Sequence, residues 1–267
     1  MENVCFVWQV GLDVTRVNSV KPGKTVEGKA SMTETNDTED MPIPVANQLA
    51  VGIIDGKWAI GTATTLEDMQ SRFDISRTVA REASRHLEAA GAITIRRRVG
   101  LVAQDPKSWQ ALNPQVIAWK LHSSQRKQEL LALTELRLSI EPAAARYAAV
   151  RASLEDKAKL PVMALQMKQL GEQGNLAEFH KLDIEFHRQV LRCSGNELFA
   201  AFADTVATVL RGRVEINMYP QQPAPEALRA HVAVGEAILN GDADGAYEAM
   251  REIVDEVDEA LRGNPLS

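Results

Sequence analysis

The chain has 267 residues, of which 45% are hydrophobic and 25% are charged, so it is long enough for two modest domains with ordinary cores. Its net charge of -6 at pH 7 excludes a uniformly basic protein, and no apolar run is long enough to cross a membrane. The two cysteines, Cys5 and Cys193, lie far apart without a C-x-x-C partner. This excludes a disulfide framework and a thiolate zinc site, and it fits a reducing, cytoplasmic compartment.

Residues 1–42 are expected to form a disordered tail. The segment KPGKTVEGKASMTETNDTED, residues 21–40, has too little apolar content to offset the entropy lost on ordering. After it, Val45–Ile54 shows an apolar stripe at helical spacing and is predicted to be the first helix of a folded domain.

Two short helices are predicted next. Thr65 is a good N-cap for a helix over Leu66–Phe73, and Ser76 is a good N-cap for a second helix that runs to about Ala89. In this second helix Val79, Ala83 and Leu87 recur at core spacing.

The opposite face of the second helix is basic and is followed by a β-ribbon. Arg77, Arg81 and Arg85 recur every four residues. Ile93-Thr94-Ile95, a basic tip at Arg96-Arg97-Arg98, a turn around Gly100 and Leu101-Val102 then indicate strand, loop and strand, which is a wing.

A basic stretch on an acidic chain points to DNA. The stretch from Arg77 to Arg98 contains six arginines and only two acids, Glu82 and Glu88, which gives it a local net charge of +4. A helix presented by a helix-turn-helix fits the major groove, and arginine suits guanine edges and phosphates. The alternative is a solvated amphipathic helix with a charged hairpin, but the wing directly after the helix favours DNA.

The run FDISRTVAREASRHLEAAGAITIRRRVGLV resembles the GntR family of bacterial transcription regulators. The resemblance implies that the recognition helix contacts DNA and that the wing enters the minor groove. The DNA-binding residues expected on this basis are Thr65, Ser76, Arg77, Thr78, Arg81, Arg97, Arg98 and Gly100. Many members carry an acidic-then-basic pair before the first of the two helices, where this chain has Leu66-Glu67. A basic DNA contact is therefore absent there, and no operator sequence can be carried over.

Residues 104–120 are predicted to be a linker. Pro106 and Pro114 punctuate the segment, and Trp109 and Trp119 could anchor it to a neighbouring domain. The pattern W..L.P.V..W also resembles the linker of GntR members that act on sugar-acid operons.

Everything from Gln125 to Arg262 has helical periodicity. Six helices are predicted, over Gln125–Ser153, Leu154–Gly171, Asn175–Cys193, Glu197–Val214, Pro225–Asn240 and Asp242–Gly263. The fold class is therefore mainly α, with a winged helix-turn-helix domain at 43–103 and an antiparallel all-α bundle at 121–263. The resemblance implies that this bundle is an FCD-type effector domain with an acid-binding cavity.

A histidine and acid cluster lies in the bundle. His180, Asp183 and His187 share one helix face, and D-x-x-x-H lets two side chains bind one metal. His231 could face them from a later helix, and such donors suit zinc, nickel or manganese more than magnesium. By themselves, these histidines could equally be ordinary hydrogen-bonded groups.

The resemblance implies that Asp183, His187 and His231 hold a metal at the cavity floor. A fourth ligand, a histidine in the family, falls at Ile253, which cannot coordinate. Either three protein ligands hold the metal with water and effector, or the site has no metal and binds the acid directly.

Arg137 lies in an otherwise apolar helix and needs an anionic partner, because a lone buried guanidinium is costly. That partner is either Glu141, one turn on, or the carboxylate of an effector, which the resemblance implies. The expected effector-binding set is Arg137, Asp183, His187, His231 and Arg213.

The sequence thus predicts a cytoplasmic repressor of a carbohydrate-acid operon. It would bind double-stranded operator DNA as a homodimer and be released by a small acid of the aldonate or uronate class, with no membrane partner. The alternative is a metal-dependent hydrolase or lyase that uses Asp183, His187 and His231, although no general base is evident and the wing stays unexplained.

Overall fold

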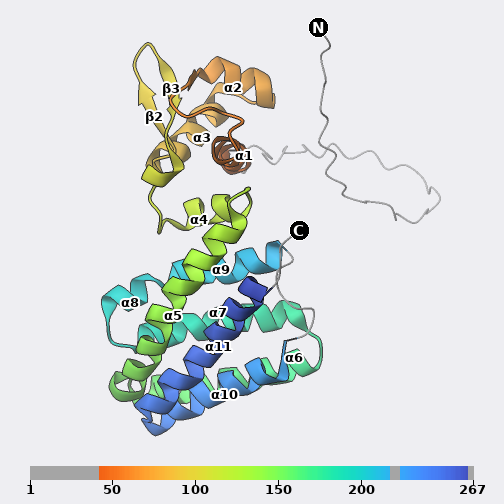
Figure 1. The fold of residues 1–267 in the computed structure, drawn as a ribbon. Coiled ribbons are helices and arrows are strands. Elements are labelled where there is room, and N and C mark those ends of the chain that lie inside the picture. The colour runs from red at the N-terminus through yellow and green to blue at the C-terminus, as the bar shows by residue number, and fades with distance from the viewer. Residues whose placement is uncertain (1–41, 217–222, 264–267) are drawn as a thin grey trace, which may run out of the picture. The chain divides into compact units, whose positions relative to one another are not determined.

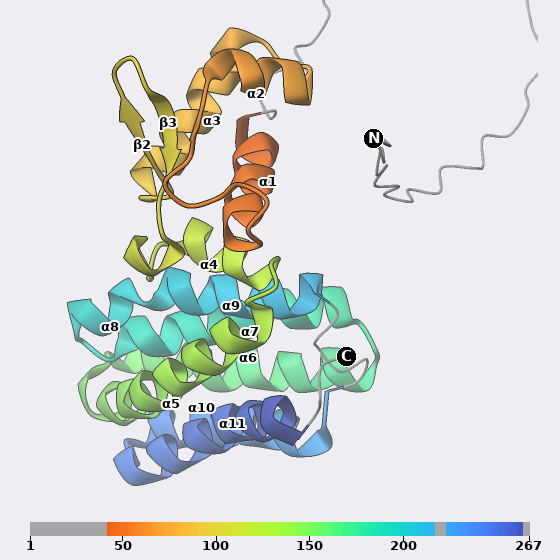
Figure 2. The same ribbon diagram turned by 45° about the horizontal axis from the view of Figure 1, so that its top comes forward.

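The structure, a computed structural model, describes residues 42–216 and 223–263 (Figures 1 and 2). Residues 1–41 of the predicted tail lie outside the described residues. No helix in the described part of the chain is both long and apolar enough to cross a membrane.

Three helices begin the described chain: α1 (Pro42–Ile54), α2 (Leu66–Phe73) and α3 (Arg77–Ala89). Thr65 caps α2 in a capping box with Asp68, and the Ser76 side chain caps α3, so both predicted caps are confirmed. The bounds of α2 and α3 therefore follow from local chemistry.

A three-stranded antiparallel sheet completes this part, with β1 (Ala63–Thr64), β2 (Ile93–Arg96) and β3 (Gly100–Ala103) in the order β1-β3-β2. The predicted wing is β2, its basic turn and β3. The sequence analysis missed β1, which pairs with Leu101 and Val102 of β3 and adds the third strand.

The predicted linker over 104–120 is wrong in part, because it contains regular structure. A 3₁₀ turn spans Pro106–Ser108, and helix α4 (Pro114–Leu121) begins behind an Asn113 cap. Both tryptophans are buried, and their rings meet edge to face at a centroid distance of 5.8 Å. The aromatic anchoring that we expected is therefore present, but on a helix.

Seven helices follow: α5 (Arg126–Arg151), α6 (Leu154–Glu172), α7 (Leu176–Cys193), α8 (Glu197–Ala201), α9 (Ala203–Glu215), α10 (Pro225–Asn240) and α11 (Ala243–Gly263). The single helix predicted over Glu197–Val214 is thus two helices, which break at Phe202. The remaining helices agree with the predicted ones to within a few residues. The predicted class, mainly α with a winged helix followed by a helical bundle, is confirmed.

The bundle packs α11 against α5 and α10, α10 against α6, and α7 against α5, α6 and α9. Gly235 on α10 allows the closest of these approaches, because a Cβ there would lie 2.9 Å from the backbone of Pro161 on α6. Facing side chains of these helices form one large apolar core. This packing brings residues of α5, α7, α9, α10 and α11 to a common cavity.

Candidate functional site: a basic recognition surface and a buried cavity

Helix α3 has the two faces that its sequence predicts. Val79, Ala83 and Leu87 are buried, and the basic residues spaced between them are exposed. The Ser76 hydroxyl accepts a hydrogen bond from the Val79 amide at 3.3 Å, which fixes the start of the helix at this surface. The exposed N-terminal turn of α3 can therefore enter a groove without disturbing the core.

The acidic residues near this surface are already engaged. Glu82 pairs with Arg85 at 2.6 Å, and Glu88 accepts a hydrogen bond from the amide of Ile95 at 3.1 Å, which ties the wing to α3. Among the described residues, Arg77 and Arg81 make no ion pair. Their charges are thus available to phosphates or base edges.

The wing presents its three arginines, Arg96 to Arg98, to solvent. Arg98 adopts a left-handed conformation with φ of 65°, and Gly100 follows with φ of 111°. A Cβ on Gly100 would lie 2.4 Å from the backbone oxygen of Thr64, so β3 can reach β1 only because this residue is glycine. Gly100 therefore shapes the wing.

Thr65 is exposed at the start of α2, and its hydroxyl oxygen accepts a hydrogen bond from the Asp68 amide at 3.0 Å. Hydrogen bonds from the Thr65 side chain and backbone lower the pKa of Asp68. Thr78 is exposed next to Arg77 at the start of α3. All eight predicted DNA-contacting residues thus lie on α2, α3, their caps or the wing.

The five predicted effector-binding residues meet in one place. Arg137 of α5, Asp183 and His187 of α7, Arg213 of α9 and His231 of α10 all line a cavity of about 90 Å³. All five are buried, Arg137 with 2% and Arg213 with 8% of its surface exposed. The sequence spacing along α7 and the packing of four helices therefore create a polar centre inside the bundle.

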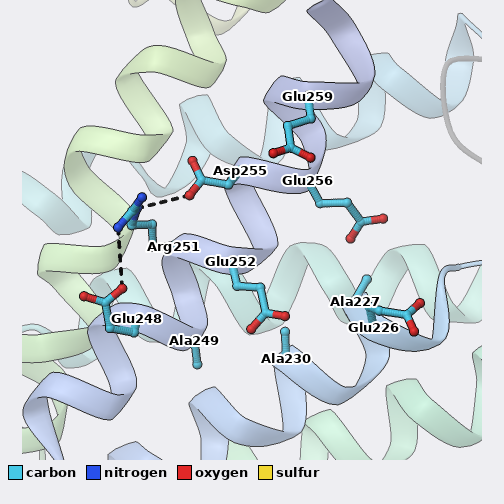
Figure 3. Close-up of a pocket in the computed structure, with 10 residues that line it drawn as sticks. All are labelled: Glu226, Ala227, Ala230, Glu248, Ala249, Arg251, Glu252, Asp255, Glu256 and Glu259. Atoms are coloured by element: carbon cyan, nitrogen blue, oxygen red, sulfur yellow. Dashed lines mark ion pairs between the residues drawn. The ribbon is translucent and has the colours of Figure 1, made fainter. Parts of the chain in front are cut away.

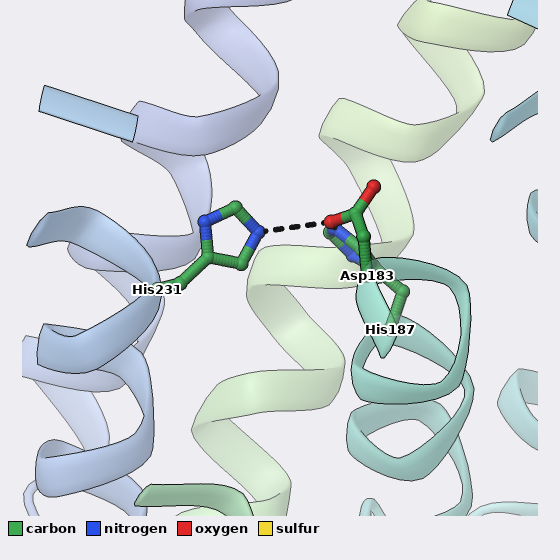
Figure 4. A group of neighbouring side chains, drawn as sticks. All are labelled: Asp183, His187 and His231. Atoms are coloured by element: carbon green, nitrogen blue, oxygen red, sulfur yellow. Dashed lines mark hydrogen bonds and ion pairs between the residues drawn. The ribbon is translucent and has the colours of Figure 1, made fainter. Parts of the chain in front are cut away.

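Asp183, His187 and His231 form the core of this centre (Figure 4). The Asp183 Oδ1 lies 3.2 Å from the Nε2 of His231 and 3.5 Å from the Nε2 of His187. One potential ligand atom from each residue lies within 4.8 Å of the others. His180, on the same face of α7, is only half-buried and is not part of this cluster.

The outer nitrogen of each imidazole has its own contact. The Nδ1 of His187 lies 2.5 Å from the Oε2 of Glu141, and the Nδ1 of His231 lies 2.7 Å from the carbonyl oxygen of Ala227. A carboxylate or carbonyl at this position orients a metal-binding histidine and leaves its Nε2 facing the ion. Both Nε2 atoms face Asp183, so the three potential donors lie on the same side of the cluster.

Arg137 pairs with Glu141, which is one of the two anionic partners expected from the sequence; the other is the carboxylate of an effector. Its Nε lies 2.5 Å from Oε1 of Glu141, and its terminal nitrogen lies 3.3 Å from Oε2. Because Glu141 also contacts His187, the chain Arg137–Glu141–His187–Asp183 links α5 to α7 through buried charges. Arg137 still lines the cavity, so its pairing leaves an effector contact possible.

The carboxylates and the histidine stabilise each other's charged forms. Burial alone would lower the pKa of His187, but Glu141 and Asp183 outweigh it and raise this pKa to about 9. Burial alone would raise the pKa of Glu141, but Arg137 and His187 lower it to about 2. Hydrogen bonds from His187 and His231 likewise overcome burial and hold the pKa of Asp183 well below its usual range. Both acids are thus ionised at neutral pH.

This donor set fits a divalent metal. One carboxylate oxygen and two imidazole nitrogens converge on one point, and at least one histidine has the carboxylate contact that metal sites commonly show. Ile253, where sequence comparison placed a fourth ligand, lines the cavity and cannot coordinate. If a metal binds here, its remaining coordination position would be filled by another residue, by water or by a bound acid.

Two acids of the site, Glu141 and Glu256, were not predicted as site residues. Glu141 was considered only as a partner of Arg137, and its contact with His187 depends on how α5 packs on α7. Glu256 lines the cavity one turn after Ile253. Its spacing of three from Ile253 was the available signal, because residues at that spacing share a helix face.

Glu256 also borders a second, open groove between α10 and α11 (Figure 3). The groove has a volume of about 560 Å³. Its acids are Glu226, Glu248, Glu252, Asp255, Glu256 and Glu259, and Arg251 is paired with Glu248 and Asp255. The surface outside the cavity is therefore strongly negative on this side.

Comparison with known proteins agrees with both halves of the chain. Residues 44–102 match the model of "Bacterial regulatory proteins, gntR family", and residues 132–256 match the model of the FCD domain. The chain is 28% identical to the galactonate operon transcriptional repressor of Escherichia coli K12, over 80% of this chain and 92% of that protein. It is 25% identical to YieP, an uncharacterized HTH-type transcriptional regulator of the same organism, over 79% of this chain and 90% of that protein.

Among solved structures, the chain resembles Lar of Listeria monocytogenes, described as controlling expression of the agr system, with a TM-score of 0.55 and 18% identity. That match covers 86% of this chain and all of the other, and it supports the fold alone. Because the family and these relatives are regulators, the alternative of a hydrolase or lyase is set aside. The chain belongs to the GntR family of bacterial transcription regulators, as a DNA-binding protein with an FCD domain.

Proposed function

We propose that this regulator represses a carbohydrate-acid catabolic operon in the cytoplasm and leaves its operator when a small carboxylate binds in the FCD domain. The observation that carries the proposal is the cavity in which Arg137 and Arg213 meet Asp183, His187 and His231. Guanidinium groups and a metal-binding cluster together suit an acid, because each attracts an oxygen anion. The similarity to a galactonate operon repressor supports aldonates or uronates as the class.

In this proposal a divalent metal such as zinc, nickel or manganese is held by Asp183, His187 and His231. The bound metal would supply an electrophilic anchor for the carboxylate or a hydroxyl of the effector. Arg213 binds the effector carboxylate at the cavity wall. Glu141 keeps His187 oriented from the opposite side.

The DNA-reading residues in this proposal belong to the first domain, and all but the partly buried Gly100 are exposed: Thr65, Ser76, Arg77, Thr78, Arg81, Arg97, Arg98 and Gly100. The N-terminal turn of α3 reads base edges in the major groove, and the wing tip enters the adjacent minor groove. One α3 reads only a half-site, so the operator is a palindrome that a homodimer binds.

The face of α6 suits the contact between the two copies. Leu154, Val162 and Leu165 are 74%, 55% and 56% exposed and lie along one side of this helix. An antiparallel pairing of two α6 helices would bring these three residues of one copy towards the same three residues of the other. A two-fold interface uses the same patch of both copies, so the exposed apolar residues of α6 would be buried against each other.

The test of the proposed function is binding to the DNA upstream of the protein's own gene, at fixed salt, with and without a panel of hexonates and hexuronates that includes galactonate. We expect specific binding, with release by one acid. Arg81→Ala should weaken specific binding by about tenfold or more, because a base contact is worth roughly 1–3 kcal/mol. Arg85→Ala is the matched control, since Arg85 is paired with Glu82 on the same face.

If Arg81→Ala binds as wild type does, α3 is not the recognition helix. If specific binding persists with every acid of the panel, the carbohydrate-acid effector is wrong, while the DNA-binding part of the proposal stands. These two outcomes separate the two halves of the proposal.

A further inference from the structure

One wall of the buried cavity is a stripe of α11. Ile253, Glu256, Val257 and Ala260 line it, at the spacing of residues that share one helix face. Glu256 is the one member of this stripe with a polar side chain. The carboxylate of Glu256 therefore lies on the same wall of the cavity as Ile253, which cannot act as a ligand.

The direction of helical side chains brings Glu256 towards Ile253. Side chains on an α-helix lean towards its N-terminus, so a residue covers the surface of the preceding turn. Glu256 lies three residues after Ile253 and is long enough to extend over that turn. An oxygen of Glu256 can thus reach the region of the cavity that a ligand at position 253 would serve.

The Glu256 side chain is exposed and stands where the cavity meets the outer groove, since it lines both. Burial raises the pKa of Glu256, and the charges of Arg213 and His231 act in the opposite direction. Its carboxylate is not among the atoms that lie within 4.8 Å of one another in the cluster of Asp183, His187 and His231. Coordination therefore requires the Glu256 side chain to swing inwards from the mouth of the cavity.

We propose that Glu256 is the fourth protein ligand of the metal, in place of the residue missing at Ile253. This inference rests on the metal site of the proposed function. Two carboxylates, Asp183 and Glu256, would balance the charge of a divalent ion, which favours a buried site because uncompensated charge is costly there. Movement of Glu256 to the metal also turns its charge away from Arg213, which then faces the carboxylate of the effector.

The experiment is a Zn²⁺ titration of the full-length protein against a chromophoric chelator, with Co²⁺ absorption as a second readout of coordination. Glu256→Gln should weaken Zn²⁺ binding by about tenfold or more and change the Co²⁺ spectrum. Glu252→Gln is the matched control, since Glu252 borders only the outer groove on the same helix. It should bind Zn²⁺ within about twofold of wild type, as expected for a change in long-range charge alone.

A rescue variant separates coordination from a structural effect. Ile253→His in the Glu256→Gln background should recover most of the lost Zn²⁺ affinity, because the imidazole would reach the same cavity from the preceding turn. If Glu256→Gln binds Zn²⁺ and Co²⁺ as wild type does, the inference is overturned while the three-residue site stands. If wild type and His187→Ala bind Zn²⁺ equally weakly, the proposed metal site itself fails, and the inference fails with it.

Discussion

At the scale of single residues, the FCD domain contains a chain of buried charged side chains, each in contact with the next. Arg137, Glu141, His187, Asp183 and His231 are each within ion-pair or hydrogen-bond distance of the next. Buried charges persist only when each has a partner, because each loses its hydration. Glu141 contacts both Arg137 and His187 in this order, so it should matter to folding as well as to the site.

We predict that Glu141→Gln lowers the free energy of unfolding by about 3–5 kcal/mol, because it leaves the buried Arg137 guanidinium without its carboxylate. Urea denaturation followed by circular dichroism measures the change. Asp244→Asn is the control: it removes an equally short pair with Arg146, but at the surface, where the loss should stay below about 1 kcal/mol. Similar losses in the two variants would contradict the role assigned to burial.

Sequence reasoning found most of these residues but not their connections. Asp183 and His187 follow from D-x-x-x-H, and Arg137 follows from its apolar surroundings. The contact of Glu141 with His187 crosses two helices, so no local spacing encodes it. Glu256 lies in the acidic run DEVDEALR, where an acid looks like part of a solvated face. Only the packing of α11 shows that this acid borders the cavity.

At the scale of elements, prediction succeeded where caps and periodicity agree. Helices α2 and α3 begin behind the side-chain caps Thr65 and Ser76, as the sequence indicates. Helix α10 has no side-chain cap at its start, and its ends are marked by Pro225 at the first position and Gly241 after the last. The two-residue strand β1 is too short to show alternation, and its pairing with β3 is not local. Helix α4 was missed because its eight residues follow one proline-marked turn and begin with a second proline, a pattern that resembles a loop.

The wing offers a prediction at this scale. Gly100→Ala should separate β3 from β1, because the new Cβ would meet the backbone oxygen of Thr64 at 2.4 Å. We expect a loss of stability larger than the roughly 1–2 kcal/mol of the left-handed conformation alone, together with weaker operator binding. Thermal unfolding and operator titration are the measurements.

Gly61→Ala is the matched control for this variant. Gly61 also has a positive φ, of 78°, but a Cβ there meets no atom within 4 Å. The control therefore reports the conformational cost without the clash. Equal losses in stability for the two variants would mean that β1 does not hold the wing.

Helix α6 offers a second prediction at this scale. Val162→Glu places a charge at the centre of the proposed contact between copies, so we expect dimerisation to weaken at least tenfold, or about 1.4 kcal/mol. Sedimentation equilibrium measures the dimer constant. Leu239→Glu changes an exposed apolar residue of α10 and should leave it unaltered. If Val162→Glu dimerises with the wild-type constant, the exposed face of α6 is not the dimer interface.

At the scale of the whole molecule, the proposed function requires that the cavity and the recognition surface influence each other. The two sites lie on different domains, so an acid can release DNA only by binding the DNA-free arrangement more tightly. The coupling is then reciprocal: the factor by which the acid weakens operator binding equals the factor by which the operator weakens acid binding.

We predict this equality for the hexonate or hexuronate that releases the protein. A tenfold effect in each direction would correspond to a coupling free energy of about 1.4 kcal/mol. Operator affinity at saturating acid, and acid affinity at saturating operator, are both measurable by titration at one salt concentration. Arg81→Ala serves as the control, because it should bind the acid as wild type does while its acid affinity no longer responds to the same concentration of operator. Release of the operator by an acid whose own affinity is unchanged at saturating operator would contradict this linkage, and the release would then not come from reversible binding of the acid to the regulator. If Arg213→Ala binds the acid as wild type does, the cavity of the FCD domain is not the effector site.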